Sequence, residues 1–341
     1  MSSPDTGFFV AAALPVLLVA LAYAAGARRR LDAGRPVSIR RHAGFGAGLA
    51  VLLISLEWPF EAWAHQLFYI HQIGFMVARI IAPMLIILSR PLGLLIAGLP
   101  RSIRTSTLAP VLSTPAVRRI WRGLAHPVAA LSLYLATLFF WVVPAVQDRA
   151  VAHPAVGYAM HLSLLLSGLL FWSRIFERRP RPHGAGHGSR LMMIWIAMLG
   201  QILLGAYLTV KTTITYPAYG TMTRLWMTAP IVDEGRGGFF IWIPSGLLSL
   251  AALILVVDMW GRHETRMDEK RRRWSPSNSA ILLYPETARA LREMTRGKNR
   301  RLAIGMIGFV LLIFSSVMGV MVAGHRLNRR ENIRLLALSK S

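Results

Sequence analysis

Residues 64–89 read AHQLFYIHQIGFMVARIIAPMLIILS, a long run in which apolar side chains predominate. About 20 such residues are enough for a helix to cross the hydrocarbon core of a bilayer. Backbone groups in lipid have no water to bind, so the segment must satisfy them internally by forming a helix. We therefore expect a transmembrane helix here. Two of its side chains, His71 and Arg79, are ionisable, and such groups inside a span mark a candidate functional site.

Apolar runs of similar length occur along the whole chain. Hydrophobic residues make up 54% of the 341 residues, and the mean hydropathy is +0.47. The further runs predict spans at about 8–26, 43–58, 127–146, 154–176, 191–210, 237–260 and 302–324. The predicted fold class is therefore all-α, a polytopic transmembrane helical bundle.

The positive charges lie between the apolar runs and alternate from loop to loop. Lys and Arg number 39 against 15 Asp and Glu, which gives a formal net charge of +24. Basic residues are concentrated in the segments 27–42, 90–126, 174–190 and 261–300, and are sparse in the segments 59–63, 147–153 and 211–236. Because basic loops stay in the cytoplasm, this pattern predicts that the N-terminus lies outside. Arginines placed in this way do not indicate nucleic acid binding.

An eighth span would place the basic tail 325–341 outside, against the rule, so we expect about seven to eight spans. The chain then divides into a first span with a basic cytoplasmic loop (1–42), a transmembrane core (43–260), a basic cytoplasmic segment (261–300), and an additional span with a basic tail (301–341). We expect the whole chain to lie in a lipid bilayer and its basic cytoplasmic segments to contact anionic lipid.

Several kinds of chemistry are excluded or unsupported. The chain has no cysteine, which excludes disulfides, thiolate metal sites, iron–sulfur clusters and covalent attachment of c-type haem. No HExxH, GxSxG or P-loop motif is present. We therefore expect a protein that is not an enzyme.

Acidic and imidazole side chains collect near the predicted outer surface. His71 and His161 each lie about two helical turns into their spans from that side. Further candidates stand at the outer ends of spans, namely Asp233, Glu234, His65, Glu57 and Glu61. The economical explanation is a polar cavity that opens outward.

The spacing of these residues limits which of them can act together. His65 and His71 are six positions apart, which on one helix turns them about 120° away from each other. A metal site would therefore be assembled across helices, with His71 and His161 at its centre and Asp233 at its mouth. The alternative is that each histidine hydrogen-bonds a neighbouring helix and serves packing alone. For Arg79 we expect pairing with a carbonyl or with Asp258, or extension toward the inner surface.

Four segments in series resemble one protein family. They are His71-Gln-Ile-Gly-Phe-Met-Val-Ala-Arg-Ile-Ile-Ala-Pro83, Leu124-Ala-His126-Pro127, His161-Leu-Ser-Leu-Leu-Leu-Ser-Gly168-Leu-Leu-Phe-Trp172, and Asp233-Glu234-Gly-Arg-Gly-Gly238-Phe-Phe-Ile-Trp242-Ile-Pro244. Together with the Tyr216-Pro217-Ala218-Tyr219 loop they are similar to the CtaG-like family, polytopic factors for assembly of caa3-type cytochrome c oxidase. The resemblance covers about residues 45–260.

The resemblance implies a plasma-membrane protein of about seven helices that aids oxidase maturation by handling copper. Two positions depart from the family's pattern. Family members often have a second histidine four residues after the one matching His71, where this chain has Phe75. The family's Asp-Gln pair is Asp233-Glu234 here, which adds an acid.

The leading hypothesis is a non-enzymatic oxidase assembly factor in the bacterial plasma (inner) membrane, crossing it several times. Its partners would be respiratory oxidase subunits, and copper would bind at His71, His161 and Asp233. One alternative is a structural or accessory subunit of a respiratory membrane complex. Another is a transporter of copper or of a small solute.

Overall fold

The computed structural model describes residues 6–56, 60–177, 185–220 and 228–274, together with isolated positions between 293 and 315. Two compact units are distinguished, Met1–Leu250 and Ala251–Ser341, and each is described by itself. Within the described ranges the regular structure is helical, without strands, as the sequence predicts.

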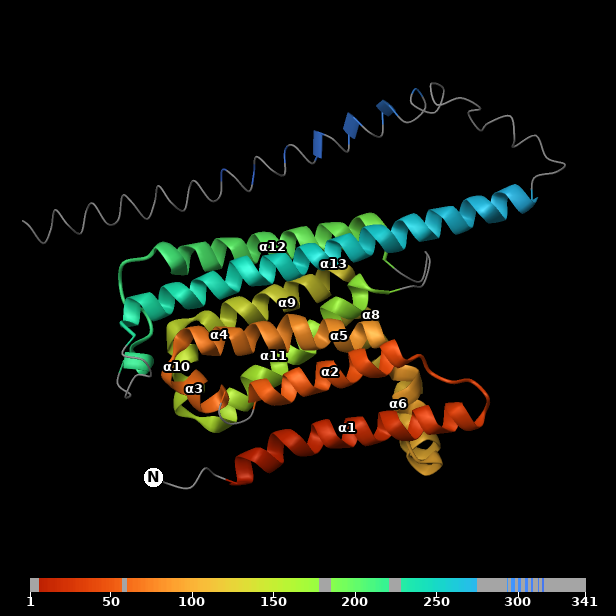
Figure 1. The fold of residues 1–341 in the computed structure, drawn as a ribbon, viewed down its shortest axis with the longest axis horizontal. Helices are drawn as coiled ribbons and strands as arrows, with labels where there is room; N and C mark the ends of the chain where they lie inside the picture. Colours follow the sequence, from red (N-terminus) through yellow and green to blue (C-terminus); the bar gives the residue numbers. More distant parts are fainter. Residues whose placement is uncertain are drawn as a thin grey trace, which may run out of the picture. The chain divides into compact units, whose positions relative to one another are not determined.

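Most of the helices follow one another through short connections, and residues 211–229 form a longer one (Figure 1). Proline occupies the first position of several of them, where its missing N–H costs nothing because that group has no helical partner. The elements are α1 (Thr6–Asp32), α2 (Ile39–Leu56), α3 (Phe60–Gln66), α4 (Phe68–Met76), the π-helix η1 (Val77–Ile81), α5 (Ala82–Ser89), α6 (Leu92–Gly98), the π-helix η2 (Ile103–Leu108), α7 (Ala109–Ser113), α8 (Pro115–Leu124), α9 (Pro127–Val142), α10 (Pro144–Ala152), α11 (Pro154–Ile175), α12 (His187–Val210), the 3-10 helix η3 (Pro217–Gly220) and α13 (Pro230–Trp274).

Five helical segments of the described chain are long and apolar enough to cross a membrane: Ile39–Leu56, Phe68–Ser89, Pro154–Ile175, His187–Val210 and Pro230–Glu269. A sixth is obtained if α8 and α9, which meet at 71°, are counted as one span. These correspond to six of the predicted spans. The predicted span 8–26 lies within α1, whose side chains are described only from residue 13 onward, and 302–324 lies outside the described residues apart from isolated positions. A total of about seven to eight spans and an outside N-terminus remain predictions.

Two predicted boundaries need correction. The helix expected at 237–260 begins at Pro230 and continues to Trp274, so the basic segment 261–300 starts as a helix. The span expected at 64–89 is interrupted, because Leu67 is extended (φ −133°, ψ 120°) and separates α3 from α4. His65 therefore lies on α3 and His71 on α4, and the angle expected for two positions on one continuous helix does not apply.

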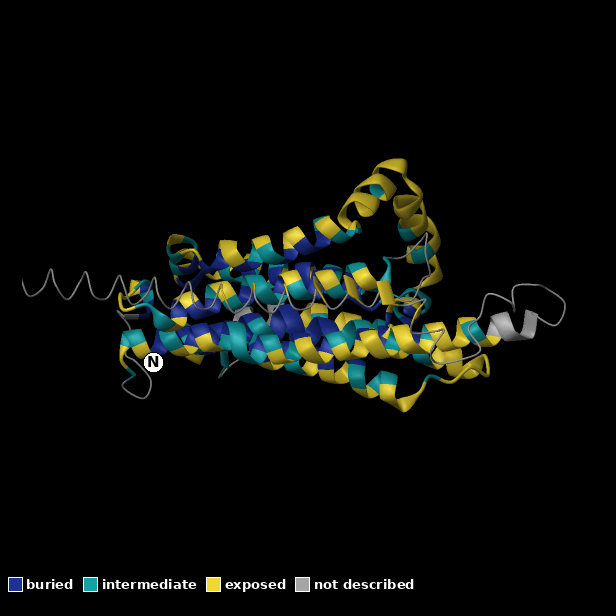
Figure 2. Ribbon diagram, turned by 90° about the horizontal axis from the view of Figure 1, so that it is seen from above, coloured by how far each residue is buried: buried dark blue, intermediate teal, exposed yellow. Residues whose placement is uncertain are grey.

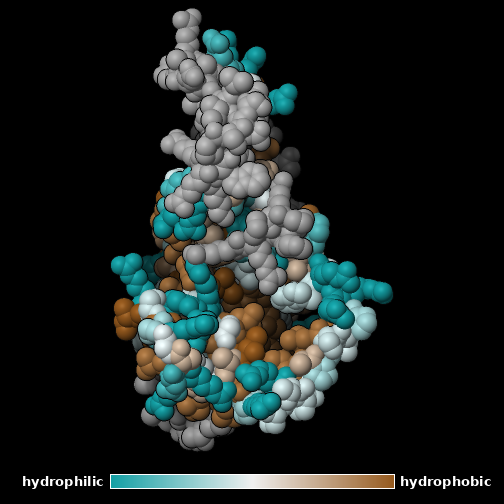
Figure 3. Space-filling model, turned by 90° about the vertical axis from the view of Figure 1, so that its right-hand side faces the viewer, coloured by the Kyte–Doolittle hydropathy of each residue, from teal (hydrophilic) through white to brown (hydrophobic). Residues whose placement is uncertain are grey.

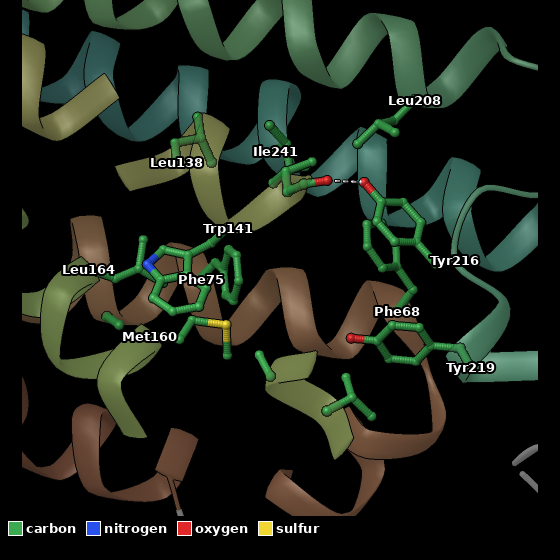
Figure 4. Close-up of a cluster of buried hydrophobic side chains, with 14 of the residues drawn as sticks. Phe68, Phe75, Leu138, Trp141, Met160, Leu164, Leu208, Tyr216, Tyr219 and Ile241 are labelled. Carbon is green, nitrogen blue, oxygen red and sulfur yellow. Dashed lines mark hydrogen bonds between the residues drawn. The ribbon is translucent and has the colours of Figure 1, made fainter. Parts of the chain in front are cut away.

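Apolar side chains form both the interior and the outer surface of the first unit. Its largest buried cluster joins α4, α9, α11 and the 211–220 loop around Phe68, Phe75, Trp141 and Leu164 (Figure 4). Along the long helices, exposed residues alternate with buried ones (Figure 2), and many exposed side chains are large and apolar, including Leu17, Leu162 and Leu166. Helices apolar on both faces are typical of membrane bundles, where the outer face meets lipid.

Two of the basic loops, 27–42 and 90–126, lie together at one end of this unit. Arg29 donates hydrogen bonds to the carbonyl oxygens of Ala97 and Leu99, and Arg41 donates to those of Ser89 and Arg90. The loops 27–42 and 90–126 are therefore joined, and hydrophilic side chains gather at this end (Figure 3). Phe68 stands at the other end of the span that finishes at Ser89, and the candidate site lies there.

Candidate functional site

His71 is buried and is held by two polar side chains from other elements. Its Nδ1 lies 2.5 Å from the hydroxyl oxygen of Tyr219 and 3.2 Å from Nε2 of Gln147. Gln147 Nε2 also donates to the Tyr219 hydroxyl, at 2.7 Å. All three residues are at most 4% exposed. This closed triangle fixes the imidazole in one orientation beneath the surface.

The second predicted histidine lies beside the first. The rings of His71 and His161 have centroids 5.9 Å apart and are nearly parallel, at 11°. Nδ1 of His161 lies 2.9 Å from the carbonyl oxygen of Gly157, which can only accept, so Nδ1 carries a proton. The Nε2 of His161 lies 3.9 Å from the position a Cβ would take on Gly74. This is an ordinary van der Waals distance, so the His161 ring lies directly against α4 at Gly74.

Asp233 is buried against the first residues of α4 instead of standing at an open mouth. Its Oδ2 accepts the backbone N–H of Phe68 at 2.9 Å, and its Oδ1 accepts that of Tyr69 at 3.0 Å. No capping bond comes from Leu67, the residue before the helix. A carboxylate here satisfies amides that lack helical partners and meets the positive end of the helix dipole. Asp233 therefore fixes the helix that carries His71.

Glu234 is likewise buried, and it holds the 211–216 loop. It forms an ion pair with Lys211 and accepts the backbone N–H groups of Thr215 and Tyr216, the latter at 2.9 Å. The Tyr216 hydroxyl donates to the carbonyl oxygen of Val142 at 2.6 Å, which is the dashed line in Figure 4. Glu234 thus secures the loop that leads into Tyr219, the partner of His71.

The loop phenols keep their protons. Burial raises the pKa of Tyr219 well above its usual value, and burial with the nearby Glu234 carboxylate raises the pKa of Tyr216. Both hydroxyls therefore remain hydrogen-bond donors at neutral pH.

Of the other predicted site residues, the structure describes the side chain of His65 and of Glu234. His65 lies on α3, beyond the break at Leu67, and Glu57 and the side chain of Glu61 lie outside the described residues. In the described ranges, no three His, Asp or Glu side chains are placed to hold one metal ion. The structure thus brings His71 and His161 together and leaves Asp233 bound to backbone amides.

The pattern of residues around this site matches a known family over most of the chain. The sequence profile of the cytochrome c oxidase caa3 assembly factor family (Caa3_CtaG) matches residues 21–263. The chain belongs to this family. The resemblance seen in the separate motifs is thereby confirmed.

Two curated relatives of the Caa3_CtaG member described here come from mycobacteria. Both are uncharacterized proteins, one of Mycobacterium bovis and one of Mycobacterium tuberculosis, and each is 23% identical over 283 residues. The match covers 82% of this chain and 43% of each relative, so the chain spans less than half the length of these relatives. No solved structure matches the chain.

Two motif residues of this Caa3_CtaG chain have a clear structural role. Gly168 of α11 packs so closely on η1 that a Cβ there would lie 2.5 Å from the carbonyl oxygen of Arg79 and 2.9 Å from Cγ of Pro83. One turn later, Nε1 of Trp172 donates to the same Arg79 oxygen at 3.0 Å. The glycine permits the contact and the indole secures it, so α11 holds the π-helical turn in place.

The expected partners of Arg79 need correction. Its guanidinium lies 4.5 Å from the ring centroid of Tyr134 and is buried between helices. Asp258, the carboxylate proposed for it, binds Arg262 on its own helix. Extension toward the inner surface is also wrong, since Arg79 is only 2% exposed.

Gly168→Ala should lower the free energy of unfolding by about 1–3 kcal/mol, because the new methyl group meets backbone atoms that cannot rotate away. Thermal unfolding of purified protein in detergent measures this. Gly246→Ala is the matched control, since a Cβ at that helical glycine meets nothing within 4 Å. Equal unfolding temperatures for the two variants would contradict the packing described here.

Two residues of the site, Gln147 and Tyr219, were not predicted from the sequence. Tyr219 belongs to the loop motif Tyr216–Tyr219, to which the sequence alone assigns no role. Gln147 lies next to the acidic Asp148 in a connection that carries no recognisable pattern. Gln147 is distinguished from other glutamines by its burial, and the local sequence does not show which glutamines are buried.

Proposed function

We propose that this chain is a non-enzymatic assembly factor for a respiratory cytochrome c oxidase in the bacterial plasma membrane, and that His71 and His161 receive copper as its cargo. Membership in the Caa3_CtaG family supports the first part. The observation that carries the second is the nearly parallel pair of imidazoles, 5.9 Å apart, contributed by two different helices.

The donor set suits a copper ion that is passed on. Imidazole nitrogen is a good copper ligand, and a neutral ring is the form that binds. Because Nδ1 of His71 accepts from Gln147, Nε2 of the neutral His71 ring carries the proton, and copper binding at His71 would have to displace that proton or the bond from Gln147. The hydrogen bond from His161 Nδ1–H to Gly157 fixes the tautomer that directs the Nε2 lone pair outward from the helix, as backbone carbonyls do for metal-bound histidines. Asp233 takes no part as a ligand in this proposal; it positions α4 and therefore His71.

Two nitrogen ligands without a third make a weak site. The chain has no thiolate to add, and Phe75 occupies the place where a second histidine of α4 would stand. A weak site releases copper readily, which is what delivery to an oxidase requires.

The test is a copper titration of purified protein against a competing chelator. We expect His161→Ala and His71→Ala each to weaken binding by at least about 10-fold, the lower bound for loss of a group that supports a metal site. His126→Ala is the control, because this exposed histidine precedes α9 away from the pair. Oxidase from cells carrying His161→Ala should also contain less copper. Copper binding equal in all three variants would refute the copper part.

A structural accessory role is the second candidate, and one observation favours it. The hydrogen bonds from Tyr219 and Gln147 to His71 are those of a residue that joins helices. Co-purification in mild detergent distinguishes the two. A stable stoichiometric complex with an oxidase supports the accessory role, whereas transient capture together with copper binding supports the assembly factor.

A further inference from the structure

A buried cation in the middle of the bundle has no anionic partner among the residues that the structure describes. Arg79 stands near the centre of the span Phe68–Ser89 and is 2% exposed. Its Nε and Nη1 atoms are buried without a hydrogen-bond partner. Over the described ranges, the carboxylates that form ion pairs do so with other basic residues. A buried charge left in this way is strongly unfavourable, and one contact with an aromatic ring offsets only part of the cost.

The same place holds a second unsatisfied polar group. Gln201 of α12 is fully buried and donates from Nε2 to the Tyr134 hydroxyl at 3.5 Å, while its Oε1 has no partner. Tyr134 thus contacts Arg79 through its ring and Gln201 through its hydroxyl. Its ring is itself fixed by stacking on Phe171, with centroids 4.1 Å apart. Three elements, η1, α9 and α12, therefore bring unpaired donors and an unpaired acceptor together.

The fold secures the position of this arginine. Gly168 and Trp172 of α11 both contact the Arg79 carbonyl, and the residue lies in a π-helical turn. Such turns inside α-helices are frequent at functional sites. The backbone of Arg79 is thus closely packed while its guanidinium is left unpaired. We take this combination to indicate that the guanidinium has a function.

We propose that Arg79, with Tyr134 and Gln201, binds a carboxylate within the bundle. A planar guanidinium is the side chain best suited to bind a carboxylate, with more than one N–H donor. One guanidinium balances one negative charge, which favours a monoanion in surroundings of low dielectric. This site is separate from the histidine pair and does not depend on the copper proposal.

The carboxylate could come from a membrane fatty acid or from a small soluble acid, and one experiment distinguishes them. The unfolding temperature of the delipidated full chain is measured with dodecanoate, with its methyl ester, and with acetate. The proposal expects dodecanoate to raise the unfolding temperature and the uncharged ester to have no comparable effect, because only the acid can bind the guanidinium. Stabilisation by dodecanoate alone indicates a membrane source, and stabilisation by acetate as well indicates a soluble one.

Variants then assign the effect to this site. Arg79→Gln should abolish the shift caused by the acid, and Gln201→Leu should reduce it, whereas Arg149→Gln, which changes an exposed arginine, should preserve it. The comparison of acid with ester uses the unmodified protein and so does not depend on the folding of any variant. Equal shifts with acid and ester, no shift with either acid, or an undiminished shift in Arg79→Gln would each overturn the proposal.

Discussion

Glu234→Gln should lower the free energy of unfolding by about 3–5 kcal/mol, the usual cost of removing one partner from a buried ion pair. The side chains of Lys211 and Glu234 are only 4% and 2% exposed, so the change leaves an ammonium buried without its counter-charge. The same carboxylate accepts the amides of Thr215 and Tyr216, which would lose their charged acceptor. Thermal or SDS-induced unfolding of purified protein gives the measurement.

A double variant separates charge from packing. Lys211→Met combined with Glu234→Gln removes both charges and should recover part of the stability lost in the single variant, because no unpaired charge remains. Arg262→Gln is the comparison at the surface. Its pair with Asp258 is exposed, so its loss should change the free energy of unfolding very little. A single Glu234→Gln variant as stable as the unmodified protein would show that the buried pair is not formed.

Asp233→Ala should lower the free energy of unfolding by about 2–5 kcal/mol, since two buried amides lose a charged acceptor. The free energy of unfolding of Asp233→Asn should lie between those of the unmodified protein and of Asp233→Ala, because its single carbonyl oxygen can accept only one of the two N–H groups. Amide hydrogen exchange at Phe68 and Tyr69 should accelerate in the same order. Asp32→Ala, at the exposed end of α1, is the control and should change neither measurement.

The Asp233 series also tests its role toward copper. If Asp233 only positions α4, Asp233→Asn should retain more copper affinity than His161→Ala, because both imidazoles remain. An equal or greater loss of copper in Asp233→Asn, with the protein still folded, would make Asp233 a ligand after all.

The helices could be found from the sequence because their signal is local. A run of about 20 apolar residues is a helix in lipid whatever its neighbours are. The start of the span predicted at 64–89 shows the limit. Residues 64–70 contain no proline or glycine that would predict a break in the helix, yet Leu67 is extended. The helix starts at Phe68, where an aspartate 165 residues away accepts its first amide.

The proximity of the two histidines could also be anticipated, since residues at equal depth in neighbouring spans can meet. His71 and His161 do lie side by side. Depth alone could not show the direction of each side chain. It placed Asp233 and Glu234 at an open mouth, whereas both are buried in hydrogen bonds to backbone amides.

The sequence by itself determined that this is a helical membrane protein, which segments are apolar enough to span, and the family to which it belongs, because these follow from composition, length and motif order. Only the tertiary structure decided which polar groups satisfy one another: Asp233 at the start of α4, Glu234 on the 211–216 loop, and Arg79 without an anion among the described residues. Pairing between buried polar groups depends on distances between residues far apart in the chain, and no local pattern of amino acids specifies those distances.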